Sequence, residues 1–192
     1  MSINVLCLHG CSQTQAFFQQ LLKTYIRLGK QYDLTFHFME AKYDHFDGGK
    51  TWYHIPLYVE EIGSKQYSES LVADCLDDVE QQIKQNNIQV LLGFSQGANV
   101  VDTYLSHRNH LTVKCAVLFS GYALVDPERQ PVDIPVLTVA SEEDDIVPYK
   151  FTPAAPVEYS NVQHMTHDKG HKLPTKNSQI REICQFMQNN AK

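Results

Sequence analysis

The residues with the clearest chemical potential form the segment Gly93-Phe94-Ser95-Gln96-Gly97, a serine flanked by glycines in a G-x-S-x-G pattern. An apolar run precedes it and a helical pattern follows it, which is the setting of a nucleophile elbow. In such an elbow the serine occupies a sharp, strained turn, and the flanking glycines prevent clashes between strand and helix. The pattern therefore predicts that Ser95 is a nucleophile. A plain strand-to-helix turn capped by Ser95 is the alternative.

A serine hydroxyl needs a nearby base to act as a nucleophile at neutral pH. The histidines that follow Ser95 in the chain are His107, His110, His164, His167 and His171. The first two close the helix after the elbow, so we expect them to point away from the site. His171 lies in a loop before the last predicted helix and can reach back to Ser95. We predict His171 as the base, with His167 and His164 as alternatives.

An acid that orients the base is expected in the loop after the strand predicted over 134–140. This loop carries four successive carboxylates, at Glu142, Glu143, Asp144 and Asp145. One carboxylate turned inward would hold the imidazole and stabilise its cation. Spacing alone does not choose among the four.

A pair of backbone amides is also needed, to bind the oxyanion that forms when the serine attacks a carbonyl. One donor is the N–H of Gln96, directly after the nucleophile. The other is expected in the loop after the first strand, where Gly10 allows the backbone to turn the N–H of Cys11 toward the site. An ordinary glycine turn is the alternative at Gly10.

The elements that must position these residues alternate along the chain. Apolar runs predict strands over 3–8, 34–39, 88–92, 115–119, 134–140 and, more weakly, 157–164. Helical spacing predicts helices over 16–28, 68–85, 96–106 and 178–188. Such alternation is typical of an α/β fold, with a mainly parallel sheet and helices on both faces. In such sheets the reactive groups lie at the carboxyl ends of the strands.

Composition narrows the classes of partner and compartment. The chain has 192 residues, which predicts a single domain over 1–192, and its net charge of −6 disfavours nucleic acid or an acidic membrane as a partner. No segment resembles a signal peptide or a membrane span. The five cysteines are odd in number and scattered, which favours reduced thiols in a reducing, cytoplasmic compartment.

Four motifs in order resemble the FSH-type serine hydrolases, a group near the small carboxylesterases and acyl-protein thioesterases. They are Leu8-His9-Gly10-Cys11-Ser12-Gln13-Thr14, Gly93-Phe94-Ser95-Gln96-Gly97-Ala98, Asp144-Asp145-Ile146-Val147-Pro148 and Gly170-His171. Gly49-Lys50-Thr51-Trp52-Tyr53 resembles the family's tryptophan-containing segment. The resemblance implies a three-layer α/β-hydrolase fold. It also implies Asp144 as the acid, with Asp145 second, His171 as the base and Cys11 as an amide donor.

The chain departs from the family pattern in places. Cys11 and Ser12 stand where bulkier or glycine-rich residues are expected, and the stretch over 119–134 leaves little room for a lid. We therefore expect an open site for short or medium acyl chains. Aromatic residues between 43 and 58, in particular Trp52 and Tyr53, are candidates for the acyl pocket, although they could equally be core packing.

The expected activity is hydrolysis of a small carboxylic ester or thioester through an acyl-enzyme, without a cofactor. Three alternatives are a metal site built from His164, His167 and His171, a hydrolase fold that binds without catalysis, and thiol chemistry at Cys11. Ester and thioester carbonyls need the same machinery, so the sequence does not separate them. It does not indicate an oligomeric state either.

Overall fold

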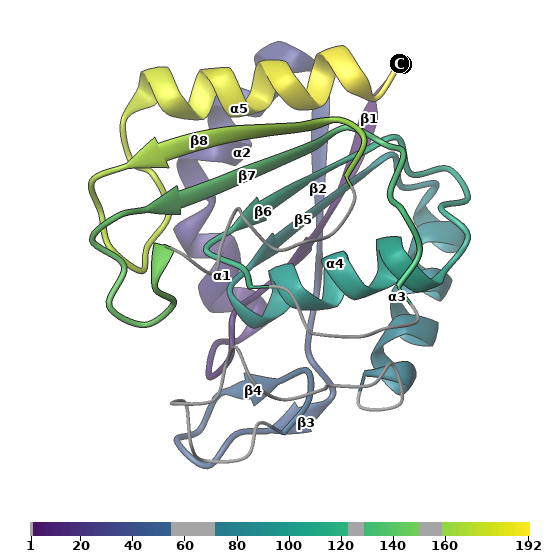
Figure 1. Cartoon of the computed structure of the whole chain (residues 1–192), viewed down its shortest axis with the longest axis vertical. Coiled ribbons are helices and arrows are strands. Elements are labelled where there is room, and N and C mark those ends of the chain that lie inside the picture. Colours follow the sequence, from purple (N-terminus) through teal and green to yellow (C-terminus); the bar gives the residue numbers. More distant parts are fainter. Residues whose placement is uncertain (1, 55–71, 123–128, 150–158) are drawn as a thin grey trace.

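The computed structural model describes residues 2–54, 72–122, 129–149 and 159–192 (Figure 1). Its strands are β1 (Ile3–Leu8), β2 (Leu34–Met39), β3 (Tyr43–Asp44), β4 (Lys50–Thr51), β5 (Val90–Phe94), β6 (Cys115–Phe119), β7 (Val136–Ser141) and β8 (Val162–His167). Its helices are α1 (Gln15–Leu21), α2 (Lys23–Gly29), the 3₁₀ turn η1 (Lys30–Tyr32), α3 (Ala73–Asn86), α4 (Gln96–His107) and α5 (Asn177–Asn190).

Six of the strands form one sheet in the order β2-β1-β5-β6-β7-β8, and every neighbouring pair is parallel. All carboxyl ends therefore lie on one edge of the sheet, as the arrowheads in Figure 1 indicate. The central strands β5 and β6 are buried along their whole length. Continuous apolar sequence suits them because parallel strands are covered on both faces.

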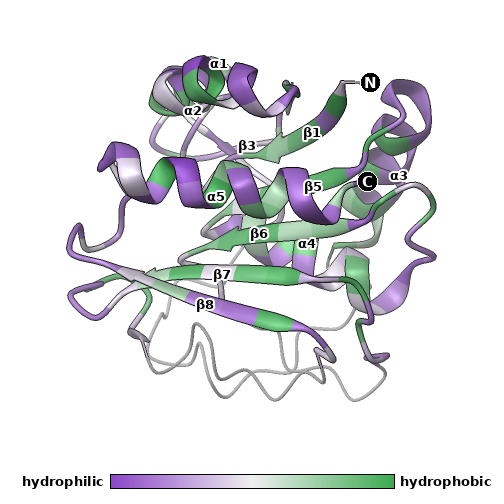
Figure 2. Ribbon diagram, turned by 90° about the horizontal axis from the view of Figure 1, so that it is seen from above, coloured by the Kyte–Doolittle hydropathy of each residue, from purple (hydrophilic) through white to green (hydrophobic). Residues whose placement is uncertain are grey.

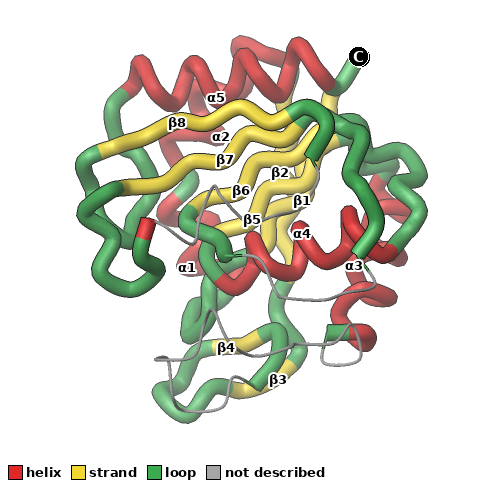
Figure 3. Tube along the Cα trace, in the orientation of Figure 1, coloured by secondary structure: helices red, strands yellow, loops and turns green. Residues whose placement is uncertain are grey.

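Helices cover the two faces of the sheet in separate groups. The helices α1, α2 and α5 lie on one face, and α3 and α4 lie on the other (Figures 1 and 3). Alternate residues of a strand enter opposite cores: Val90 and Leu92 pack on the α5 side, and Leu91 packs on the α4 side. Figure 2 shows the apolar sheet between these helices, whose outer faces are hydrophilic. The predicted α/β class with a mainly parallel sheet is confirmed.

The element boundaries differ from the predicted ones in several places. The helix predicted over 16–28 is two helices that meet at Leu22, and the helix predicted from 68 begins at Ala73. The last strand begins at Val162 and ends at His167, later than predicted. As a result, His167 ends a strand and does not belong to the following loop.

The stretch after β2 carries the candidate aromatic residues and is described as far as residue 54. Its described part forms the small antiparallel hairpin β3–β4, away from the main sheet in Figure 3. The rest of the candidate aromatic stretch between 43 and 58, from residue 55 on, lies outside the described residues, as do residues 123–128 of the stretch in which little room for a lid was expected.

All five cysteines are free thiols; Cys11 is partly exposed and the other four are buried. In the described part of the chain no helix has the length and apolar character needed to cross a membrane.

Candidate active site

Ser95 joins β5 to α4 in a strained turn. Its φ of 53° and ψ of −118° lie outside the regions that L-residues normally adopt. A hydrogen bond of 2.8 Å from the Ser95 amide to the Phe119 carbonyl fixes the turn against β6. This is the backbone geometry expected of a nucleophile elbow.

The two glycines of the motif allow strand and helix to approach closely. A β-carbon at Gly93 would lie 2.5 Å from the Cα of Ala98, and one at Gly97 would lie 2.3 Å from the Leu8 carbonyl oxygen. Real β-carbons do not approach backbone atoms so closely. Both positions therefore require glycine if the Ser95 turn is to lie where it does.

The structure brings His171 onto the Ser95 side chain. Nε2 of His171 lies 3.0 Å from Oγ of Ser95, and Nδ1 lies 2.8 Å and 3.0 Å from the two carboxylate oxygens of Asp144. The serine, the imidazole and the carboxylate thus form one hydrogen-bonded chain. Because both ring nitrogens are engaged, the rotation of the imidazole is fixed.

The backbone around Asp144 explains why it, and not its neighbour, faces His171. Its carboxylate accepts hydrogen bonds from the amides of Ile146 (3.0 Å) and Val147 (2.8 Å), which turn the side chain inward. Asp144 is buried, whereas Asp145 is exposed to solvent. Only one of the two carboxylates predicted as candidates therefore contacts the imidazole.

The loop that carries His171 is tied to the end of β7. Gly170 has a φ of 59°, in the left-handed region, and its amide donates to the Ser141 hydroxyl over 3.1 Å. The His171 ring also packs against Phe94, with the ring centroids 5.1 Å apart. These contacts hold the loop so that the His171 ring lies against the elbow.

The two amides predicted to bind an oxyanion come from different elements, the loop after β1 and the first residue of α4. A β-carbon on Gly10 would lie only 3.4 Å from Cβ of Ser95, so the loop after β1 directly adjoins the elbow. In the described part of the chain, the Cys11 amide donates to no protein acceptor. Gln96 is the first residue of α4, so its N–H has no acceptor within the helix.

Trp52 and Tyr53 do not contact the cavity beside Ser95 in the described structure. Both are buried, with 0% and 1% of their surfaces exposed. The Trp52 indole donates to the His9 carbonyl over 2.7 Å, and the Tyr53 carbonyl accepts from the Gln96 side chain over 2.8 Å. They pack against His9 and Gln96, next to the two proposed amide donors. Their burial matches the alternative of core packing and gives the acyl-pocket hypothesis no support.

The cavity beside Ser95 has a volume of about 400 Å³ and a largely apolar wall. It is lined by Gly10, Cys11, Gln13, Phe17, Leu21, Phe94, Ser95, His171, Lys172, Leu173, Pro174 and Thr175. Phe17 and Leu21 are exposed, and they lie one helical turn apart on α1. The sequence shows both only as part of a helical pattern, so nothing in it marked them as neighbours of Ser95.

The other candidate histidines lie elsewhere. Nδ1 of His164 bonds to the Thr138 hydroxyl over 2.7 Å, and Nδ1 of His167 accepts from the Lys169 amide over 3.2 Å. Burial lowers the pKa of His167. Within the described ranges, no three His, Cys, Asp or Glu side chains are grouped as metal ligands, so these histidines do not form the alternative metal site there.

Cys11 is poorly suited to the alternative thiol chemistry. Partial burial raises the pKa of its thiol, which favours the unreactive protonated form. Its Sγ lies 3.6 Å from the Thr51 hydroxyl, and in the described part of the chain it makes no hydrogen bond to a histidine.

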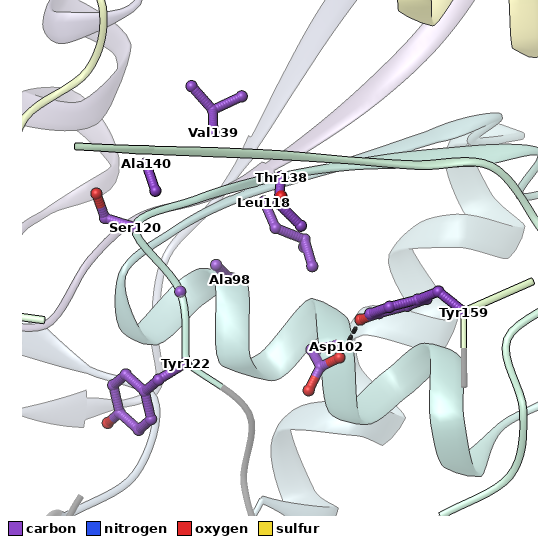
Figure 4. A pocket seen from close by; sticks show the side chains of 10 residues that line it. Ala98, Asp102, Leu118, Ser120, Tyr122, Thr138, Val139, Ala140 and Tyr159 are labelled. Atoms are coloured by element: carbon purple, nitrogen blue, oxygen red, sulfur yellow. Dashed lines mark hydrogen bonds between the residues drawn. The ribbon is translucent and has the colours of Figure 1, made fainter. Parts of the chain in front are cut away.

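A second, much smaller cavity lies on the α4 side of the sheet, between α4 and β7 (Figure 4). Its wall includes Asp102, which forms a bidentate ion pair with Arg129 at 2.8 Å and accepts a hydrogen bond from Tyr159. The volume of about 20 Å³ is enough for a single water molecule. The ion pair ties the segment before β7 to α4.

Comparison with known proteins gives a family match over most of the chain. Residues 1–183 match the family described as serine hydrolase (FSH1). An esterase of Aedes aegypti is 37% identical over 122 residues, which cover 59% of this chain and 44% of that protein. An esterase of Drosophila melanogaster is 29% identical over 54% of this chain and 40% of its own length. The chain thus spans less than half the length of the curated relatives it matches.

Solved structures share the fold. Arabidopsis thaliana SOBER1 aligns over 100% of both chains with a TM-score of 0.81 and 17% identity. The Bacillus cereus carboxylesterase aligns over 98% of this chain and 89% of its own, with a TM-score of 0.75 and 15% identity. These likenesses confirm the α/β-hydrolase fold. Together with the match over nearly the whole sequence, they lead to one conclusion: the chain belongs to the serine hydrolase (FSH1) family.

Proposed function

We propose that the chain hydrolyses small carboxylic esters or thioesters through an acyl-enzyme on Ser95. The observation that carries the proposal is the continuous chain of hydrogen bonds from Ser95 Oγ through His171 to Asp144. A hydroxyl, an imidazole and a buried carboxylate in this order are the components of a serine hydrolase triad. The esterase names of the relatives agree with this activity.

In the first half of the reaction, Nε2 of His171 removes the proton of Ser95 Oγ while Oγ bonds to the carbonyl carbon. The carbonyl oxygen becomes an oxyanion, and the amides of Cys11 and Gln96 bind it. When the tetrahedral intermediate collapses, the bond to the leaving oxygen or sulfur breaks. The leaving group receives the proton from His171, and the acyl group stays on Ser95.

In the second half, water replaces the leaving group. His171 takes a proton from the water while the water oxygen attacks the acyl carbon. It then returns this proton to Ser95 Oγ as the carboxylic acid product departs. Asp144 holds Nδ1 of the ring, so that Nε2 faces the serine and the imidazolium is stabilised. Every step uses groups of the chain and water.

The wall of the cavity supports substrates with an apolar acyl group. Phe17 and Leu21 on one side and Leu173 on the other lie close enough to Ser95 to enclose a short or medium acyl chain. Esters and thioesters would bind and react in the same way. A panel of p-nitrophenyl esters and acyl-CoA thioesters of increasing length measures which is preferred.

A fluorophosphonate probe tests the proposal, because it adds covalently to an activated serine. We expect labelling of Ser95, identified by mass spectrometry of the digested protein, and loss of both labelling and ester hydrolysis in Ser95→Ala and His171→Ala. Ser178→Ala, at an exposed serine on α5, is the control and should behave like the wild type. A wild-type chain that is neither labelled nor active would instead favour a hydrolase fold that only binds.

A further inference from the structure

One of the two proposed oxyanion donors is oriented by a neighbouring side chain. The Cys11 amide shares its peptide unit with the carbonyl of Gly10, and Nδ1 of His9 lies 2.7 Å from this carbonyl oxygen. In a planar trans peptide, the N–H points opposite to the C=O. A bond that fixes the Gly10 carbonyl therefore also fixes the direction of the Cys11 N–H.

The other ring nitrogen of His9 identifies the tautomer. Nε2 accepts a hydrogen bond of 3.1 Å from the amide of Ala41, so it carries no proton. Nδ1 must then carry the proton and donate it to the Gly10 carbonyl. The ring is neutral, with one nitrogen acting as donor and the other as acceptor.

The surroundings of His9 maintain this neutral form. The side chain is completely buried, and burial lowers its pKa by more than the Glu40 carboxylate, 3.7 Å from Nε2, raises it. A buried polar ring is costly unless its hydrogen bonds are satisfied, and both bonds of this ring are to backbone groups. An apolar side chain would fill the space at lower cost, but it could not hold the Gly10 carbonyl.

The buried side chain of Trp52 contacts both the ring and the backbone of His9. Its ring packs against the imidazole, with the centroids 5.2 Å apart, and its indole N–H donates to the His9 carbonyl over 2.7 Å. The orientation of the histidine therefore depends on a residue 43 positions later in the chain.

The same segment also holds the second proposed donor. The Gln96 side chain accepts from the Thr51 hydroxyl (2.9 Å) and the Trp52 amide (3.0 Å), and it donates to the Tyr53 carbonyl (2.8 Å). All of these groups are buried. Hydrogen bonds of the segment 51–53 thus connect His9, which orients the Cys11 amide, to Gln96, whose own amide is the other donor.

We propose that His9 is a positioning residue, whose neutral imidazole directs the Cys11 N–H toward the oxyanion that forms on Ser95. This inference rests on the proposed function. His9 touches neither substrate nor the reacting atoms, and it acts through the Gly10–Cys11 peptide. Its loss should weaken binding of the transition state while leaving binding of the ester little changed.

Two amide substitutions separate the two nitrogens of the ring. In His9→Asn the side-chain N–H₂ falls near the position of Nδ1 and can still donate to the Gly10 carbonyl. In His9→Gln the amide falls near Nε2, so that this bond is lost. We expect kcat to fall by up to about 10²-fold in His9→Gln and His9→Ala with KM little changed, which is at the lower end of the effect of losing one oxyanion donor. His9→Asn should recover most of the rate.

The Ki of a transition-state analogue distinguishes loss of oxyanion binding from general damage to the fold. A trifluoromethyl ketone adds to Ser95 as a charged hemiketal, so its Ki should rise across these variants in proportion to the fall in kcat/KM. The Ki of a plain amide of the same shape, which forms no oxyanion, should not change. Thermal unfolding shows what fraction of each variant is folded, and rates are expressed per folded molecule.

Trp52→Phe provides an independent test if the His9 variants do not fold. Phenylalanine keeps an aromatic ring beside His9 but cannot donate to the His9 carbonyl, so kcat should fall and the trifluoromethyl ketone should bind more weakly. The inference is overturned if His9→Asn and His9→Gln lose activity equally, or if the Ki of the trifluoromethyl ketone does not change in an impaired variant. If the wild type shows no hydrolysis and no labelling, the proposed function fails, which is distinct from either of these outcomes.

Discussion

Nε2 of His171 lies 3.0 Å from Oγ of Ser95, although 76 residues separate them in the sequence. The sheet bridges this separation, because β5 ends at the serine and β7 and β8 end at the loops of Asp144 and His171. The imidazole is at once bonded to the serine and to the acid. The predictions below follow from this arrangement and from the walls around it.

Asp144→Asn should be far more damaging than Asp145→Asn. An amide N–H placed against Nδ1 of His171 favours the tautomer in which Nε2 carries the proton and cannot accept it from Ser95. We expect kcat for ester hydrolysis to fall by up to about 10⁴-fold. Asp145→Asn is the matched control, since its carboxylate is exposed and should change kcat only slightly. The opposite ranking would transfer the role of the acid to Asp145.

Leu21→Ala and Phe17→Ala should change the preference for acyl-chain length. Removing an apolar wall should alter the discrimination between chains by about 1–3 kcal/mol, read from kcat/KM on esters of increasing length. Phe46→Ala is the control, because Phe46 is exposed on the β3–β4 hairpin and does not line the cavity.

Trp52→Ala makes a contrasting case within the same assay. Trp52 contacts His9 and Gln96, next to the two proposed oxyanion donors, and does not line the cavity. Its loss should therefore lower kcat/KM for all chain lengths alike. A fall in kcat/KM that is confined to esters with long acyl chains would instead support Trp52 as part of the acyl pocket.

The free energy of unfolding should decrease as the pH falls below about 6.5, the pKa of an unperturbed histidine. Burial lowers the pKa of His9 and His167 in the folded chain. Over this range the unfolded chain therefore binds protons that the folded chain does not, and each group contributes a slope of at most about 1.4 kcal/mol per pH unit. Urea unfolding at pH 7.5 and 5.5 measures the change.

Substitution of His167 checks whether this residue contributes to the pH dependence of the free energy of unfolding. His167→Asn should flatten the pH dependence, because it removes one of the two histidines whose pKa burial lowers. An equal slope in His167→Asn and the wild type would mean that the proton uptake occurs elsewhere.

Gly97→Ala should abolish hydrolysis and destabilise the fold. The added β-carbon would lie 2.3 Å from the Leu8 carbonyl oxygen and 2.5 Å from that of His9, so helix α4 would have to move away from β1. Gly48→Ala is the comparison, since Gly48 has a positive φ of 93° but no atoms within 4 Å of the added carbon. It should lower stability modestly and leave kcat unchanged, as measured by thermal unfolding and ester hydrolysis.

The parts that the sequence predicted best are those governed by local sterics and periodicity. Gly93 and Gly97 mark the elbow because the clash they avoid lies within the strand–turn–helix unit. The strands β1, β5 and β6 are recognisable because burial on both faces favours runs of mostly apolar residues. The separation of Asp144 from Asp145 needed the structure or the family pattern, because adjacent carboxylates are equivalent until two amides turn one of them inward.

The least predictable parts depend on contacts between distant segments. Trp52 and Tyr53 lie in a stretch without periodicity, and their burial follows from bonds to His9 and Gln96, 43 residues away in either direction. Phe17 and Leu21 belong to an amphipathic pattern that identifies a helix but not what lies beside it. The role of His9 depends on the orientation of a single peptide unit, which sequence does not specify.

The parallel sheet also determines when the site can appear during folding. β1 pairs with β5 in a register that joins Val5 to Val90, and each further ladder likewise waits for a crossover to close. Such non-local pairing folds slowly relative to helical structure. Since Ser95, Asp144 and His171 follow three different strands, we expect the proposed hydrolytic activity to return only after these ladders have assembled. The indole of Trp52, the single tryptophan of the chain, is buried through its hydrogen bond to His9, 43 residues away, so its fluorescence should also report on a non-local contact.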